Sequence, residues 1–120
     1  RILNAARENN CPTIFFPKDI GNGVSIIDKS ICDYVSVDWH TPIDHARKII
    51  DSELGIQGNM DPRIFYQDYS EIEEYLNSLI NFGSQNQNWI FNLGHGFLPD
   101  IDHKKVKFVV DWIKDKDWNR

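Results

Sequence analysis

The 120-residue chain lacks most of the features that mark secreted, membrane-spanning or nucleic-acid-binding proteins. Its two cysteines, Cys11 and Cys32, are too few for a disulfide framework and too far apart for a C-x-x-C motif. No apolar run approaches the roughly 20 residues of a membrane-spanning helix. Thirteen basic against eighteen acidic residues give a net charge of -5, so no nucleic acid partner is expected. These absences favour a globular protein with reduced thiols.

Several motifs that carry chemistry are absent as well. The chain has no G-x-S-x-G nucleophile elbow, no glycine-rich phosphate loop and no G-x-G-x-x-G fingerprint. His40 and His45 are five residues apart, which places them on different faces of a helix, and neither cysteine accompanies a histidine at ligand spacing. The sequence therefore predicts no metal site.

Short apolar runs rich in β-forming residues alternate with helical patterns. The runs are residues 13–16, 34–37, 55–57 and 89–93, and the helical patterns cover residues 1–10, 41–50, 70–83 and 102–113, with a short helix at 24–27. Runs without polar alternation are typical of parallel strands that are buried on both faces. This order predicts right-handed βαβ units and an α/β fold with a parallel sheet.

Capping residues predict where two of these helices begin and end. Thr41 is expected as an N-cap with Pro42 at the first helical position. Ser70 and Glu73 match a capping box, in which each side chain accepts a hydrogen bond from the other residue's free backbone N–H. Gly83 is the expected C-terminal stop of that helix.

The residues that follow the four strands are the candidates for chemistry, because ligands of parallel α/β proteins bind beyond the carboxyl ends of the strands. His95 is the sharpest candidate, since Gly94 and Gly96 would let a ligand reach both its imidazole and the adjacent amides. An incidental histidine in a turn remains the alternative. Lys18 is equally a partner for a carboxylate or a simple surface charge. The strand-end residues are Lys18, Asp19, Asp38, Trp39, His40, Gly58, Asn59, Asp61, Gly94, His95 and Gly96.

Two segments closely resemble the uroporphyrinogen decarboxylase family. They are GIQGNMDP at residues 55–62 and NLGHGFLPD at residues 92–100. Two shorter segments, FPKD at residues 16–19 and VDW at residues 37–39, precede them and stand in the family's order. The resemblance runs from about residue 11 to residue 112 and implies a TIM-type (β/α)8 barrel. Because the chain begins with arginine and is too short for a barrel, we expect residues 1–120 to be a single partial domain. That domain would be the C-terminal half of the barrel, about four βα units.

The resemblance also implies an activity in heme and porphyrin biosynthesis. Members of the family remove the four acetate carboxylates of uroporphyrinogen III to give coproporphyrinogen III, and they use no cofactor. A pyrrole protonated on carbon accepts the electrons that a cofactor accepts in other decarboxylases. The tetrapyrrole is the expected partner, a homodimer the expected assembly, and the cytoplasm the expected location, with a plastid-type organelle as the alternative.

Only one residue of the chain matches a site position of the family. His95 is expected to bind substrate near its carboxylates, and Lys18, Gly94 and Gly96 are candidates for lining the cleft. The family's catalytic aspartate is expected upstream of residue 1. The resemblance therefore assigns no catalytic residue and no metal ligand to this chain, which by itself is expected to be inactive.

Four residues need separate comment. Asp38 and Asp61 belong to strand-end motifs and are expected to hold loops, with Asp61 opening a turn or helix. Pro17 stands where the family usually has a small residue, and His40 stands where it usually has a hydroxyl residue. Both departures are expected to reshape the rim of the cleft only slightly.

Two other hypotheses for the function of the chain remain open. A corrinoid-dependent methyltransferase of the same barrel superfamily would bind zinc through histidine and cysteine, but Cys11 precedes a strand and its thiolate would lie at the wrong end of the sheet. The chain could also be a non-catalytic structural or assembly fragment. In a half barrel the two unpaired edges of the four-stranded sheet predict self-association of the isolated chain.

Overall fold

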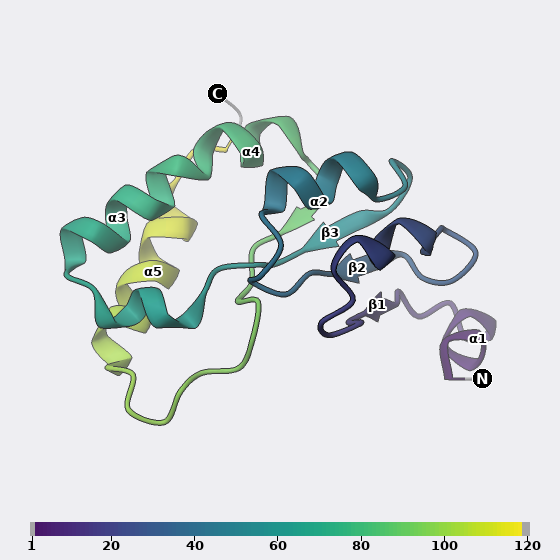
Figure 1. Cartoon of the computed structure of the whole chain (residues 1–120), viewed down its shortest axis with the longest axis horizontal. Helices are drawn as coiled ribbons and strands as arrows, with labels where there is room; N and C mark the ends of the chain where they lie inside the picture. Colours follow the sequence, from purple (N-terminus) through teal and green to yellow (C-terminus); the bar gives the residue numbers. More distant parts are fainter. Residues whose placement is uncertain (1, 119–120) are drawn as a thin grey trace. The chain divides into compact units, whose positions relative to one another are not determined.

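The structure, a computed structural model, describes residues 2–118 and contains one four-stranded parallel sheet (Figure 1). The order of the strands in the sheet equals their order in the chain, so every crossover moves one place in the same direction. A barrel is built in this way, whereas the strand order of a doubly wound sheet reverses. The predicted α/β class is confirmed, with strands β1 (Ile14–Phe15), β2 (Tyr34–Ser36), β3 (Gly55–Gln57) and β4 (Trp89–Ile90).

The chain folds into two compact units. The first unit is the chain up to Met60 together with Asn88–His95, and it contains the whole sheet. The second unit is Asp61–Gln87 together with the chain from Gly96 onward, and it is helical. The chain therefore leaves the first unit after β3, returns to form β4, and leaves again after His95.

The core of the first unit lies on one face of the sheet. Val35 and Ile56 are paired across β2 and β3, and both are fully buried. Ile43 and Ala46 are the buried residues of the helix that follows β2, and this helix packs against the 3-10 turn that contains the buried Val24. The helical elements of this unit are α1 (Ile2–Glu8), η1 (Gly21–Ile26) and α2 (Ile43–Ile49), and residue 1 of the expected first helix lies outside the described residues.

The opposite face of the sheet is more exposed. Because side chains alternate along a strand, Ile14 and Ile90 point away from Val35 and Ile56, and they are 46% and 37% exposed. Near the carboxyl ends of β2 and β3 this face carries a polar pair, in which the amide of Gln57 donates to the hydroxyl of Ser36 at 3.1 Å. In a closed barrel this is the face that lines the interior.

The second unit packs its helices around apolar side chains. Ile72 and Leu76 are fully buried, and Val109 is 3% exposed. Tyr69 meets Phe108 edge to face at 5.1 Å between ring centres, which joins the third and fifth helices. The elements are η2 (Pro62–Tyr66), α3 (Tyr69–Ser78), α4 (Ile80–Gln85) and α5 (His103–Asp115).

The start of α3 differs from the prediction. The capping box is formed by Asp68 and Glu71, not by Ser70 and Glu73. The Asp68 N–H donates to the Glu71 side chain at 2.9 Å, and the Asp68 side chain accepts from the Glu71 N–H. Aspartate caps a helix as well as serine does, so Asp68, which the sequence analysis did not consider, can start the helix two residues earlier. The earlier start places Tyr69 within the helix, where its ring contacts Phe108.

Two further helix boundaries were predicted wrongly. Pro42, not Thr41, is the N-cap of α2, and its backbone is extended at φ -52 and ψ 133. Thr41 instead accepts a hydrogen bond from Asn59 through its carbonyl oxygen. Gly83 is buried inside α4 and ends no helix, because Leu79 keeps helical dihedral angles and the chain turns directly into the next helix.

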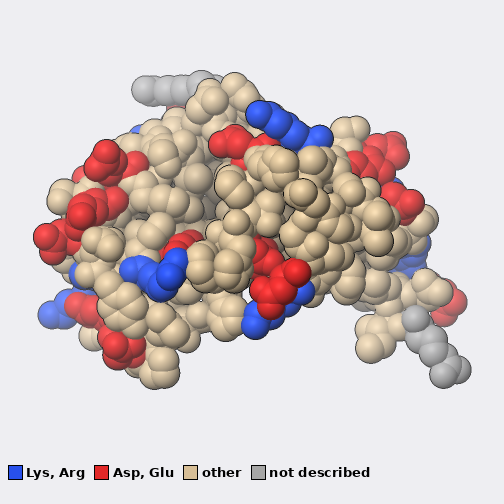
Figure 2. Space-filling model, viewed as in Figure 1, with Lys and Arg blue, Asp and Glu red and all other residues tan. Residues whose placement is uncertain are grey.

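Charged side chains of both signs are scattered over the described surface seen in Figure 2, where the acidic side chains are the more numerous. Within residues 2–118, none of the helices has the length and apolar character needed to cross a membrane.

Candidate active site

The strand-end residues that the sequence singled out lie mostly in the first unit. Lys18 and Asp19 follow β1, Asp38 follows β2, and Asn59 follows β3, all within the chain up to Met60. His95 follows β4 in the same unit. In a parallel sheet the carboxyl ends of all strands lie at the same end of the sheet. The structure therefore brings these loops together at the end where barrel proteins bind ligands.

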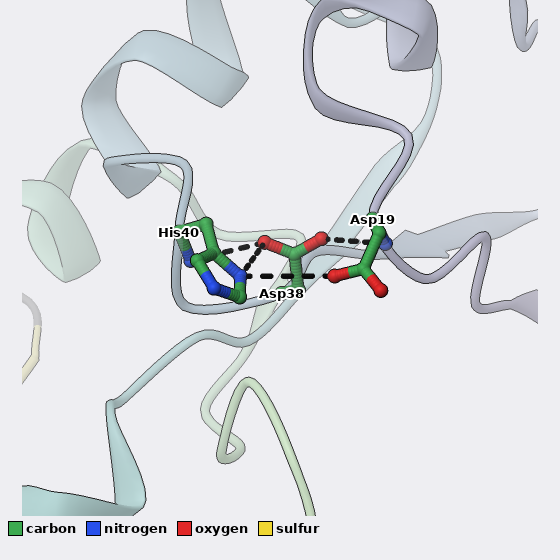
Figure 3. Close-up of side chains that lie close together, drawn as sticks. All are labelled: Asp19, Asp38 and His40. Atoms are coloured by element: carbon green, nitrogen blue, oxygen red, sulfur yellow. Dashed lines mark hydrogen bonds and ion pairs between the residues drawn. The ribbon is translucent and has the colours of Figure 1, made fainter.

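Asp38 connects two of these loops. Its carboxylate is 6% exposed and accepts two backbone hydrogen bonds, from the Asp19 N–H at 3.0 Å and from the His40 N–H at 3.0 Å (Figure 3). Backbone donors that are fixed in this way stabilise a carboxylate that has little contact with water. The prediction that Asp38 holds loops is confirmed.

Asp61 caps the first helical turn of the second unit. It is the N-cap of η2, where its side chain accepts from the Arg63 N–H at 2.9 Å and Pro62 occupies the start of the turn. The Arg63 guanidinium also donates to the same carboxylate, and this hydrogen bond raises the pKa of Arg63. The expectation that Asp61 opens a helix is therefore correct.

His40 lies in the same loop as Asp38, two residues further along the chain. Its ring stacks on Trp39 with 3.9 Å between ring centres, and its Nδ1 is 3.4 Å from Asp38 and 3.8 Å from Asp19 (Figure 3). The imidazole is 58% exposed, so it stands at the surface of the strand-end edge. Lys18 is exposed as well, and its ammonium lies 3.9 Å from Asp19.

Asp19, Asp38 and His40 are the residues of the described chain whose potential metal-ligand atoms come together, all within 4.8 Å of one another. The sequence predicts no metal at this position. Asp38 already has both of its oxygens engaged with backbone donors, and the other two groups are largely exposed. No buried side-chain nitrogen or oxygen of the described residues lacks a hydrogen-bond partner, and the buried Asp38 carboxylate is bonded to two backbone donors.

Asn59 is a residue that the sequence analysis named without giving it a role. Its side-chain amide donates to the Asp38 carbonyl at 2.8 Å and also to the Thr41 carbonyl. Both acceptors lie in the loop after β2, about twenty residues earlier in the chain. Contacts between residues so far apart leave no local pattern in the sequence. The only sign of this contact was an asparagine that follows Gly58 at the end of a strand.

The two glycines around His95 have different surroundings. A Cβ atom on Gly94 would lie 2.3 Å from the Trp39 backbone nitrogen, so Gly94 allows the backbones of two loops to touch. Within the described chain, a Cβ on Gly96 would meet open space. His95 itself is exposed. The substrate-binding role of His95 and the cleft-lining roles of Lys18, Gly94 and Gly96 remain predictions.

Both cysteines lie at the other end of the sheet, because Cys11 precedes β1 and Cys32 precedes β2. Cys11 is exposed, while Cys32 is buried, and burial raises the pKa of its thiol. An open cavity of about 430 Å³ at this end is lined by Arg7, Asn10, Cys11, Pro12, Lys29, Asp33 and Tyr34. In parallel barrels this end serves stability and not catalysis.

Sequential parallel strands, with linked polar loops at their carboxyl ends, define a barrel-type α/β protein. Comparison with known proteins identifies which barrel this is. A family model described as uroporphyrinogen decarboxylase (URO-D) matches residues 1–116, and the chain belongs to that family. Its four parallel strands are thus part of a (β/α)8 barrel.

Individual relatives agree with the family match. Proteins named uroporphyrinogen decarboxylase from Trichlorobacter lovleyi, Wigglesworthia glossinidia brevipalpis and Helicobacter pylori are 33%, 38% and 38% identical to this chain. The alignments cover 94%, 88% and 92% of the chain, but only 33%, 29% and 32% of the relatives. The chain thus spans about a third of the length of the curated relatives that it matches.

Proposed function

We propose that the protein to which this chain belongs is a uroporphyrinogen decarboxylase of porphyrin biosynthesis. It would convert uroporphyrinogen III to coproporphyrinogen III by removing the carboxylates of four acetate side chains. The observation that carries this proposal is the family match over residues 1–116, together with the relatives that bear this name.

Each of the four steps exchanges a carboxylate for a proton. A pyrrole carbon is first protonated, and the ring then accepts the electron pair of the bond to CO₂ as that bond breaks. Protonation of the resulting exocyclic carbon leaves a methyl group, and loss of the ring proton restores the pyrrole. The net change consumes one proton and releases one CO₂. The ring itself accepts the electrons, so the proposal includes no cofactor and no metal.

His95 is proposed to bind a substrate carboxylate. It is exposed in the loop that follows β4, at the end of the sheet where barrel enzymes bind their substrates. An imidazole N–H can donate to a carboxylate, and Gly96 leaves room beside it. Lys18, at the end of β1, is proposed to line the same cleft and to supply positive charge.

The isolated 120 residues are proposed to be inactive, because they span about a third of the relatives and include no candidate for the catalytic aspartate. We further propose that the whole protein is a cytoplasmic homodimer. The three relatives named above are bacterial, and none supports the plastid alternative.

The test is a decarboxylation assay on the full-length protein. Uroporphyrinogen III is supplied in reduced form, and the products are oxidised and separated by their number of carboxylates. The proposal expects species with seven, six and five carboxylates to appear in turn and coproporphyrinogen to accumulate, with or without a zinc chelator. Absence of any conversion would overturn it.

The methyltransferase alternative makes the opposite prediction. It requires a thiolate and an imidazole on one zinc ion, but both cysteines precede their strands while His40 and His95 follow theirs. Stoichiometric zinc in the purified full-length protein, with methyl transfer that the chelator abolishes, would favour the methyltransferase over the decarboxylase.

A further inference from the structure

The loop after β2, residues 38–41, is contacted by the loops that follow all three other strands. The loop after β1 donates to it through the Asp19 N–H, which is 3.0 Å from the Asp38 carboxylate. The loop after β3 donates to it through Asn59. The loop after β4 packs on it at Gly94. All of these residues belong to the first unit, so residues 38–41 connect the four strand ends.

The side-chain nitrogen of Asn59 makes two hydrogen bonds to this loop. Both hydrogens of its amide point to carbonyl oxygens of the loop, those of Asp38 and Thr41. An aspartate of the same shape would place a carboxylate oxygen against these two carbonyls, and the two hydrogen bonds would become repulsive contacts. The position therefore requires a donor.

Gly94, in the loop after β4, packs directly against the backbone of residues 38–41. A Cβ on Gly94 would lie 2.3 Å from the nitrogen and 2.8 Å from the Cα of Trp39, and backbone atoms cannot rotate away. On its other side, the Gly94 N–H donates to the Met60 carbonyl at 2.8 Å. Gly94 is therefore fixed between the loop after β2 and the loop after β3, and His95 is the next residue.

We propose that Asp38 and Asn59 are positioning residues for His95. They hold residues 38–41 in place, Gly94 packs against that loop, and the location of Gly94 sets where the His95 imidazole can meet a substrate carboxylate. This inference rests on the proposed substrate-binding role of His95. Neither Asp38 nor Asn59 is assigned contact with the substrate.

A double-mutant cycle in the full-length protein tests the coupling. Asn59→Asp is expected to raise KM for uroporphyrinogen by about tenfold with a smaller effect on kcat, because displacement of a binding group weakens substrate contact. In a His95→Ala background the same substitution should change KM less than twofold. Asn77→Asp, at an exposed position of α3, is the matched control and should leave KM unchanged. Equal effects of Asn59→Asp in both backgrounds would overturn the proposal.

A measurement without substrate keeps the inference separate from the proposed function. In the NMR spectrum of the full-length protein, Asn59→Asp and Asn59→Ala should shift the Gly94 amide and the His95 imidazole signals, whereas Asn77→Asp should not. Asn59→Ala removes both hydrogen bonds without adding charge, so it serves if the aspartate variant fails to fold. Unchanged Gly94 and His95 signals in a folded variant would contradict the inference even if the enzyme proves to be a decarboxylase.

Discussion

Asp38 and His95 follow two strands of the same sheet, yet their surroundings suit them to different tasks. The Asp38 carboxylate is buried and accepts two backbone hydrogen bonds, which makes it part of the framework. The His95 side chain is exposed beside a glycine that leaves open space. The difference in burial, more than residue type, therefore separates Asp38, which holds the loops, from His95, which can meet a ligand.

Replacement of His95 tests the proposed contact with substrate. His95→Ala in the full-length protein should raise KM by about tenfold or more, since a hydrogen bond to a charged group contributes about 1.5–3 kcal/mol. His95→Asn keeps an N–H donor and should lose less. Steady-state kinetics measure both, with thermal unfolding as the control for folding. Wild-type kinetics in both variants would contradict the assignment.

Tyr75 gives the second unit a pH dependence at alkaline pH. Burial raises its pKa to about 12 from an ordinary value of 10. The folded state therefore favours the neutral phenol, and this contribution to stability is complete below pH 10 and is lost as the pH rises through 12. The loss is at most about 1.4 kcal/mol per pH unit in that window.

Urea unfolding at several pH values, compared with Tyr75→Phe, checks this prediction. Because phenylalanine cannot ionise, the difference in the free energy of unfolding between the two proteins should change only between about pH 10 and 12. A constant difference across that range would show that Tyr75 ionises normally in the folded protein.

The candidate site was only partly predictable from residue types. The sequence predicted that Asp38 holds loops and that Asp61 opens a turn or helix, because aspartates at strand ends commonly accept backbone hydrogen bonds, and the structure confirms both. It did not predict that Asn59 reaches a loop twenty residues away, or that Gly94 touches Trp39. Such contacts depend on the register and spacing of the strands, which a linear pattern does not contain.

At the scale of single elements, the N-cap of α3 is Asp68, whereas the sequence predicted Ser70. Asp68→Ala should lower the free energy of unfolding by about 1 kcal/mol, the usual contribution of an N-cap. Ser70→Ala is the matched control and should change it by about 0.5 kcal/mol or less. Chemical denaturation gives both values. A larger loss from Ser70→Ala than from Asp68→Ala would restore the original prediction and contradict the structure.

The strands were predicted better than the helix ends. All four apolar runs contain a strand, because a run of β-forming residues between turns has few other stable arrangements once it is buried. The predicted helix start at Thr41 and helix end at Gly83 are wrong, because Pro42 caps α2, while Leu79 keeps helical angles and the chain continues into α4, where Gly83 is buried. Local signals give the type of an element more reliably than its last residue.

At the scale of the whole molecule, the described sheet has two strands, β1 and β4, that pair on one side only. Exposed Ile14 and Ile90 lie on these strands. Unpaired strand edges with apolar side chains favour pairing between chains. The isolated 120 residues should therefore associate as their concentration rises, which sedimentation velocity measures, whereas a well-folded monomer at all concentrations would contradict the partial-barrel account.

The most direct test of the central claim is a crystal structure of the full-length protein with coproporphyrinogen bound. We predict that the tetrapyrrole lies at the carboxyl ends of the strands, with His95 within about 3.2 Å of one of its carboxylates. The loop of residues 38–41 should keep its contacts with Asn59 and Gly94. A tetrapyrrole bound at the opposite end of the sheet, near Cys11 and Arg7, would contradict the account.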